Sequence, residues 1–145
     1  MEGALYRIGQ LSKLSNVSPR TIDYYTKLGL IRPEKRSASN YRYYSDETLR
    51  RLKRIEMLKR EKYSLEEIKI HLDQCEKVSR DEQVTDKLTA LQLHLKQLEK
   101  EVREIGPMIE QLKPSQAKNL YRLITPSGAA VIEALLLLLG KGPIM

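Results

Sequence analysis

The first residues of the chain place hydrophobic and polar side chains with the spacing of two short helices. Residues 8–15 put Ile and Leu on one face, which predicts an amphipathic helix. We expect this helix to end at Asn16, because Asn tolerates the left-handed backbone of a sharp turn. Ser18 and Pro19 are typical of a new helix start, and Gly29 is typical of its end. The pattern predicts a helix-turn-helix.

A loop and a short strand are predicted next. Pro33 ends the helical spacing, and a small polar stretch follows it. The alternating residues 41–44 predict a strand that returns beside residues 30–34, so we expect a small hairpin, or wing. A hairpin alone is only marginally stable, so some of its side chains must pack against the helices. The sequence leaves open whether Tyr43 and Tyr44 enter the core or contact phosphate.

Two further helices complete the first half. Ser45 is placed to cap the first of them, which carries a Leu and Ile stripe and is basic elsewhere. Ser64 and Glu67 form a capping box that begins the second. Basic residues, including Lys59 and Arg60, lie at the turn between the two helices.

Hydrophobic residues of the second half are spaced alternately four and three apart. They include the expected dimerisation residues Leu88, Leu91, Leu95, Leu98, Val102 and Ile105. This spacing is the seam of a coiled coil. A continuous helix over the seam is about 43 Å long, too long to bury its stripe against so small a domain, so it requires a partner helix. Gly106 and Pro107 are expected to kink or end it.

The last part of the chain carries an apolar stretch at residues 129–139, which is interrupted only by Glu133. Its 11 residues are too few to cross a bilayer, so no membrane span is expected. We expect a buried helix packed on a dimer or at a ligand pocket. An exposed anchor for a membrane or a partner is the alternative.

The charge of this 145-residue chain is unevenly distributed. Residues 1–63 carry 15 Lys or Arg and 7 Asp or Glu, a net charge of +8, whereas residues 64–145 carry 11 and 12, a net charge of −1. Seven of the eight Tyr residues also lie in the first half. Lys and Arg displace the counterions of a polyanion, and Tyr can donate to phosphate oxygens, so the first half suits nucleic acid. A solvated basic face with Tyr in the core is the alternative.

The exposed face of the second predicted helix carries groups that can reach phosphates and base edges in a major groove. These groups are Ser18, Arg20, Thr21, Tyr24 and Lys27. Asp23 is the odd member of this face, because a carboxylate is repelled by phosphates unless it accepts from a cytosine amino group or pairs with a neighbouring Arg. Arg36 lies near the tip of the predicted hairpin and is expected to approach the duplex from there.

Other chemistry is weakly supported. Cys75 is the single Cys, so no intrachain disulfide can form, and we expect a reducing, cytosolic compartment. Cys75 and His71 supply two metal ligands at most, so a core or surface thiol is favoured and no metal or other cofactor is expected. Redox or effector sensing by Cys75 stays open. The sequence has no Gly-rich phosphate loop and no nucleophile with a base at a recognised spacing, so no enzyme is expected.

The order of these residues resembles a known family. The strings IGQLSKLSNVSPRTIDYYTKLGLIRPEKR and NYRYYSDETLRRLKRIEMLKREKYSLEEIKIHL are similar to those of the MerR-type transcription regulators, over residues 6–73. The resemblance implies a winged helix-turn-helix, a second helical pair and a long helix that dimerises antiparallel. It also implies binding to pseudo-palindromic promoter sites, with activation by distortion of the promoter.

The resemblance carries residue roles with it. It places Arg20, Thr21, Tyr24 and Tyr25 in the recognition helix, Tyr41 and Arg42 in the wing, and Lys59 and Arg60 near the phosphate-contacting second pair. This chain departs from the family pattern at Asp23, where a basic residue is usual, and at Thr26, where an acid is common. Asp23 therefore puts the inherited base preferences in doubt.

We expect a mainly α-helical protein with three parts: a winged helix-turn-helix DNA-binding domain at 1–78, a dimerisation helix at 79–113 and a short apolar segment at 114–145. Its expected function is that of a homodimeric, cytoplasmic, nucleoid-associated transcription regulator. Expected partners are double-stranded DNA, a second copy and RNA polymerase, with a small-molecule effector at the dimer helix or the C-terminal segment. An architectural DNA-binding protein and a coiled-coil scaffold with a membrane- or partner-binding tail are the alternatives.

Overall fold

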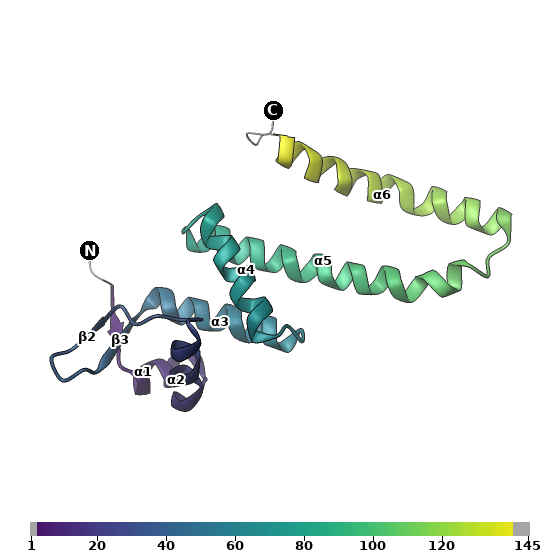
Figure 1. The fold of residues 1–145 in the computed structure, drawn as a ribbon. Helices are drawn as coiled ribbons and strands as arrows, with labels where there is room; N and C mark the ends of the chain where they lie inside the picture. Colours follow the sequence, from purple (N-terminus) through teal and green to yellow (C-terminus); the bar gives the residue numbers. More distant parts are fainter. Residues whose placement is uncertain (1–2, 141–145) are drawn as a thin grey trace. The chain divides into compact units, whose positions relative to one another are not determined.

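The computed structural model describes residues 3–140 and is mainly helical (Figure 1). Its elements are β1 (Leu5–Tyr6), α1 (Ile8–Ser15), α2 (Pro19–Leu28), β2 (Lys35–Arg36), β3 (Arg42–Ser45), α3 (Asp46–Arg60), α4 (Leu65–Val78), α5 (Glu82–Ile109) and α6 (Pro114–Gly140). The helix-turn-helix, the wing, the second helical pair and the long helix are all present. The predicted fold class is confirmed.

Local side-chain chemistry sets the ends of the short helices. Asn16 and Gly29 adopt the left-handed backbone, with φ of 60° and 78°, directly after α1 and α2. The hydroxyl oxygens of Ser18, Ser45 and Ser64 accept hydrogen bonds from the third backbone N–H of α2, α3 and α4. These groups supply partners to backbone atoms that a helix end leaves unpaired, as predicted from the sequence.

The small sheet differs from the predicted hairpin. It has three strands in the order β1-β3-β2, all antiparallel, and β1 was not predicted. The strand β3 pairs with β2, with Lys35 opposite Tyr43, rather than with residues 30–34 along their length. The reason is that Leu30 and Ile31 are buried in the core and are therefore unavailable as an exposed strand. A third strand gives the wing more support than a hairpin alone.

One hydrophobic core holds the helix-turn-helix, the wing and the second helical pair together. Its buried members come from α1 to α4 and from the segments between them: Leu11, Val17, Ile22, Tyr25, Leu30, Ile31, Tyr44, Leu52, Ile55, Leu58, Ile68 and Leu72. Tyr44 is fully buried, so the core alternative holds for this residue. Because α2 and the wing both contribute residues to this core, their exposed faces are fixed relative to each other.

The first part of α5 packs on the DNA-binding elements. Thr85 and Thr89 are buried, and the buried guanidinium of Arg54 in α3 pairs with Glu82 and, at 2.7 Å, with Asp86. The chain accordingly divides into the compact units Met1–Lys96 and Gln97–Met145. The predicted boundary at residue 78 coincides with the end of α4, and it stays a prediction.

The helix α5 ends near Pro107, as predicted, whereas α6 is longer than expected. The helix α5 continues only two residues beyond Pro107, to Ile109, and a turn then leads to α6. The apolar stretch then belongs to a helix of 27 residues, Pro114–Gly140, which continues through Pro126. By length and composition alone, α6 is long and apolar enough to cross a membrane, because the helix is longer than the 11-residue stretch considered in the sequence. None of its described residues is buried in the single chain.

Candidate nucleic-acid interface

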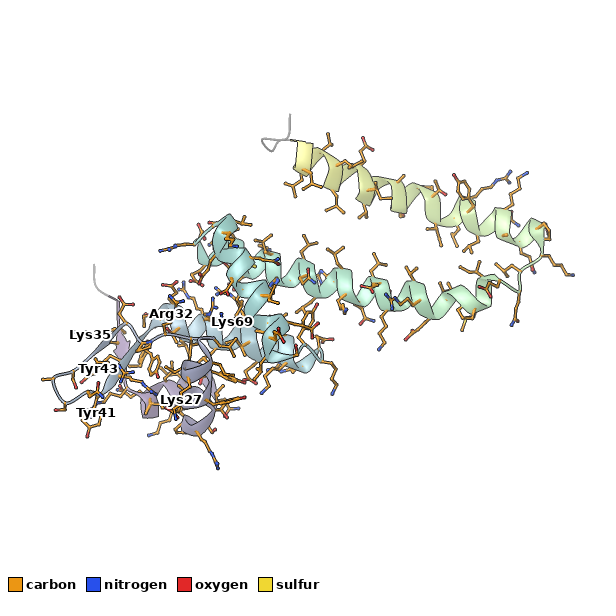
Figure 2. The ribbon with its side chains drawn as sticks, in the orientation of Figure 1. Lys27, Arg32, Lys35, Tyr41, Tyr43 and Lys69 are labelled. Atoms are coloured by element: carbon orange, nitrogen blue, oxygen red, sulfur yellow. The ribbon has the colours of Figure 1, made fainter. Side chains whose placement is uncertain are left out.

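The exposed face of α2 gathers the predicted base-reading and phosphate-contacting side chains. A shallow hollow of about 390 Å³ is lined by Arg20, Thr21, Asp23, Tyr24 and Lys27. The Tyr24 side chain is 52% exposed, so its ring and hydroxyl are accessible. Figure 2 shows Lys27 on this helix and Tyr41 and Tyr43 on the wing. Ser18 caps α2 and donates to the Thr21 hydroxyl at 2.9 Å, so its hydroxyl positions the start of the helix.

Asp23 is the centre of an ion-pair cluster between α2 and the wing. Its carboxylate accepts a hydrogen bond from the Arg42 guanidinium at 2.6 Å and lies 3.0 Å from the Lys27 Nζ. The Arg42 hydrogen bond, followed by that of Lys27, lowers the pKa of Asp23 below its ordinary value. The same Asp23 bond raises the pKa of Arg42. Of the alternatives for Asp23, pairing with a neighbouring Arg is the one the structure shows.

A second contact joins α2 to the wing inside the protein. The Thr26 hydroxyl donates to the Ile22 carbonyl at 2.8 Å and lies 2.9 Å from the Tyr44 hydroxyl. Together with the Asp23–Arg42 pair, it fixes β3 against the recognition helix at two points. The wing and α2 are therefore held as one surface.

Tyr25 is not part of the accessible surface, so the predicted contact of its side chain with DNA is wrong. Its side chain is 1% exposed, and its hydroxyl accepts from the Lys59 Nζ at 2.9 Å and donates to Glu56 at 3.3 Å. Burial raises the pKa of Tyr25, and the bond to Tyr25 raises the pKa of Lys59. Tyr24 and Tyr25 are adjacent on a helix, so one of them faces outward and the other faces the core. Lys59 and Arg60 remain exposed at the end of α3.

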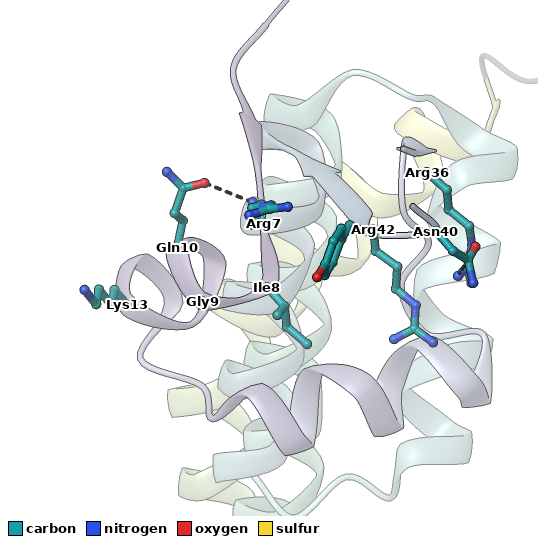
Figure 3. A pocket seen from close by; sticks show the side chains of 9 residues that line it. Arg7, Ile8, Gly9, Gln10, Lys13, Arg36, Asn40 and Arg42 are labelled. Atoms are coloured by element: carbon teal, nitrogen blue, oxygen red, sulfur yellow. Dashed lines mark hydrogen bonds between the residues drawn. The ribbon is translucent and has the colours of Figure 1, made fainter. Parts of the chain in front are cut away.

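The wing and the start of α1 enclose a larger open hollow, of about 700 Å³ (Figure 3). Four cationic side chains line it: Arg7, Lys13, Arg36 and Arg42. The Arg7 guanidinium lies over the Tyr41 ring at 4.5 Å from its centroid, and Arg36 donates to the Asn40 side chain at 3.3 Å. Four cations around one hollow suit a phosphate backbone.

Arg7 and Lys13 were missed by the sequence reasoning. Arg7 precedes α1 directly, and Lys13 lies in its last turn, where a basic residue is an ordinary helix-end feature. Their part in the hollow depends on the wing, which is more than 20 positions further along the chain. The only signal in the sequence was the excess of positive charge in the first half.

The predicted dimerisation residues form an open stripe along α5. Leu91, Leu95, Leu98, Val102 and Ile105 are 39% to 58% exposed, and Leu88 is half-buried. Thr85 and Thr89, on another face, are the buried residues of this helix. The stripe is thus separate from the face that docks on the DNA-binding elements and is free for a partner helix.

Cys75 lies on the core-facing side of α4, away from the candidate nucleic-acid interface. Its Sγ is 3.5 Å from the Nε2 of His71, which in turn lies 3.2 Å from the Thr89 hydroxyl of α5. Burial raises the pKa of the Cys75 thiol and lowers that of His71. Within residues 3–140, three or more His, Cys, Asp or Glu side chains do not come together in a metal-binding cluster.

Comparison with known proteins gives consistent matches. Residues 6–75 match the family described as MerR HTH family regulatory protein. The chain is 36% identical over 134 residues to the HTH-type transcriptional regulator CueR of Bacillus subtilis, covering 92% of each chain. It is 38% identical over 107 residues to the heavy metal-dependent transcription regulator 1 of Rhizobium meliloti, covering 73% of this chain and 71% of that one. The solved structure of the HTH-type transcriptional regulator SkgA from Caulobacter crescentus is 26% identical, with a TM-score of 0.53 over 94% of this chain and 99% of that one.

Proposed function

The chain belongs to the MerR family of DNA-binding transcription regulators, and from this premise we propose that it acts as a homodimer on a pseudo-palindromic promoter site. The observation that carries the proposal is the single surface formed by α2 and the wing, with exposed cations along it. In this proposal α2 enters the major groove, where Arg20, Thr21 and Tyr24 face base edges and phosphates. Members of this family are regulators, not enzymes.

The wing and α1 supply the backbone contacts of the proposed complex. Arg7, Lys13 and Arg36 line the open hollow and are positioned for phosphates beside the groove. Arg42, which the sequence predicts as a phosphate contact, is held by Asp23 and serves instead to fix the wing against α2. Lys59 and Arg60 extend the cationic surface from the end of α3.

The stripe on α5 supports the dimer. An open seam of Leu, Val and Ile at heptad spacing requires a partner helix, and a second copy supplies an identical seam. A two-fold dimer presents two copies of α2 to the duplex, and this favours an inverted repeat as the binding site. In this proposal the dimer binds across a promoter in the cytoplasm, at the nucleoid. It distorts the promoter DNA, and RNA polymerase then acts on the distorted promoter.

A small effector is proposed to bias this distortion. The name of the Rhizobium meliloti relative describes dependence on heavy metal. The donor set described in this chain does not fit a tetrahedral metal site, because Cys75 and His71 provide two ligands where four are needed. We therefore propose an effector bound at the dimer helix or the C-terminal segment and assign no metal to it.

The dimer is tested by the mass of the protein in solution. Leu95→Lys places a charge in the seam, and the mass is expected to fall from that of a dimer to that of one 16.8 kDa chain. Gln97→Lys is the matched control, because it adds the same charge to an exposed position of α5 outside the seam and should leave the dimer intact. Light scattering on both variants and the wild type decides the question. An unchanged mass for Leu95→Lys would refute the seam as the dimer interface.

A further inference from the structure

The helix α6 presents apolar side chains to solvent along much of its length. It runs for 27 residues, contains an 18-residue window of mean hydropathy 1.9, and buries none of that window in the single chain. Residues 123–140 contain Glu133 as their one ionisable side chain. Neither the DNA-binding surface nor the α5 seam accounts for so long an apolar helix, so what covers its apolar side chains must be found from its own chemistry.

The length of the apolar part fits a lipid bilayer. At 1.5 Å per residue, 18 helical residues span about 27 Å, close to the roughly 30 Å of a bilayer's hydrocarbon core. The stretch holds Leu123, Ile124, Val131, Ile132 and the successive leucines at 135–139. Pro126 lies within it, and a proline inside a helix is tolerated in membrane spans, where neighbouring groups supply the lost hydrogen bond.

The distribution of these leucines around the helix favours lipid over a second copy. Successive residues of a helix point about 100° apart, so the five leucines at 135–139 cover its whole circumference. Leu136, Leu137, Leu138 and Leu139 are 60% to 64% exposed, and Leu135 is half-buried, so most of the circumference of this segment is open. A partner helix covers one stripe, as on α5, and leaves the opposite leucines in water. A bilayer covers all sides.

The N-terminal end of α6 carries the groups that suit a membrane surface. Lys113, Lys118 and Arg122 precede the apolar part, without an acidic residue among positions 113–122. Tyr121 stands beside them and is 71% exposed. Tyr and basic side chains favour the headgroup region, and basic flanks mark the cytoplasmic side of a span. This orientation keeps the DNA-binding unit in the compartment that contains the DNA.

We propose that α6 inserts into an anionic lipid bilayer through residues 123–140 and anchors the regulator at the cytoplasmic face of a membrane. The anchor lies in a different compact unit from the DNA-binding surface and shares no residue with it. Glu133 is the one ionisable group in residues 123–140, and it opposes insertion, since an ionised carboxylate is costly in hydrocarbon.

Vesicle flotation of the full chain tests the anchor. The purified protein is mixed with vesicles of phosphatidylcholine and phosphatidylglycerol, floated through a density step, and washed with about 0.5 M salt to remove surface attraction. The wild type is expected to float and to resist both the salt wash and alkaline carbonate extraction. Leu137→Glu/Leu138→Glu is expected to reduce the floated fraction about tenfold or more. Glu133→Gln, the matched control on the same helix, should float at least as well as the wild type.

Two results would overturn the anchor. Release of the wild type by salt would show that only the cationic DNA-binding surface meets the lipid. A wild type that stays at the bottom, with a solution mass that falls in the Leu137→Glu/Leu138→Glu variant, would show that a second copy covers α6. Duplex binding by each variant, measured on the same preparation, reports folding of the first unit, so a failed anchor is distinguished from a failed regulator.

Discussion

Replacing Asp23 with Asn tests how the recognition helix and the wing are held together. The substitution keeps the shape of the side chain but removes the charge that pairs with Arg42 at 2.6 Å and with Lys27 at 3.0 Å. Both cations are then free to reach phosphates. The variant is expected to bind a random duplex more tightly at low salt and to discriminate less well between a selected site and random DNA, because Arg42 no longer fixes the wing.

The size of the effect follows from the number of cations released. Each new phosphate contact steepens the logarithmic dependence of affinity on salt by about 0.9, so one freed cation adds about 3.5-fold to the loss of affinity between 50 and 200 mM salt. Two freed cations would add about 12-fold over the same range. Fluorescence anisotropy with a labelled random duplex at several salt concentrations measures this slope.

Glu110→Gln is the control, because it makes the same change of charge in the second compact unit, outside the ion-pair cluster. Its slope should match that of the wild type. The ion pair between Asp23 and Arg42 also predicts a pH dependence. Because the pKa of Asp23 is lowered, its carboxylate stays ionised as the pH falls, and the ion pair is lost only when the pH passes below that lowered pKa. If Asp23→Asn and Glu110→Gln gave the same slope as the wild type, the ion-pair cluster would have no part in DNA binding.

Three further substitutions or treatments test other parts of the structure. Arg54→Met leaves Glu82 without its buried partner and should lower the free energy of unfolding by about 3 kcal/mol in urea titrations, whereas the exposed Arg50→Met should change it little. Arg7→Ala should reduce the salt slope of DNA binding by about one and weaken all duplexes alike, and a changed sequence preference would contradict its phosphate role. Burial raises the pKa of Cys75, so its alkylation should be slower in the folded than in the urea-unfolded protein and should keep rising above pH 9.0; equal rates in both states would contradict its burial.

Features governed by neighbouring residues could be predicted from the sequence. The caps at Ser18, Ser45 and Ser64 and the left-handed turns at Asn16 and Gly29 depend on groups within three or four positions. The heptad stripe of α5 is likewise a local pattern, and its leucines are indeed exposed on one open face. These features were enough to recover the order of helices and the helix-turn-helix.

Features governed by distant contacts could not be predicted. Asp23 and Arg42 are 19 positions apart, and only the folded wing brings them together. Tyr24 and Tyr25 look equivalent in the sequence, and the core decides which of them is buried. The strand β1 has two residues, too few for any alternating pattern.

The extent of α6 was missed for a different reason. Thr125, Pro126, Ser127 and Gly128 are residue types that usually end a helix, so the apolar stretch at 129–139 was considered without the residues before it. The helix nevertheless continues through Pro126 to Gly140, and the Thr125 hydroxyl donates to the Tyr121 carbonyl in this turn.

Selection of preferred sites from random duplex DNA tests the central claim most directly. The 145-residue chain is incubated with a random library at about 0.15 M salt, where nonspecific attraction is weakened, and bound duplexes are sequenced over several rounds. A homodimeric regulator that reads bases through α2 is predicted to enrich an inverted repeat, and Leu95→Lys should lose that enrichment. Binding without any enriched sequence would contradict a base-reading dimer and indicate an architectural DNA-binding protein instead.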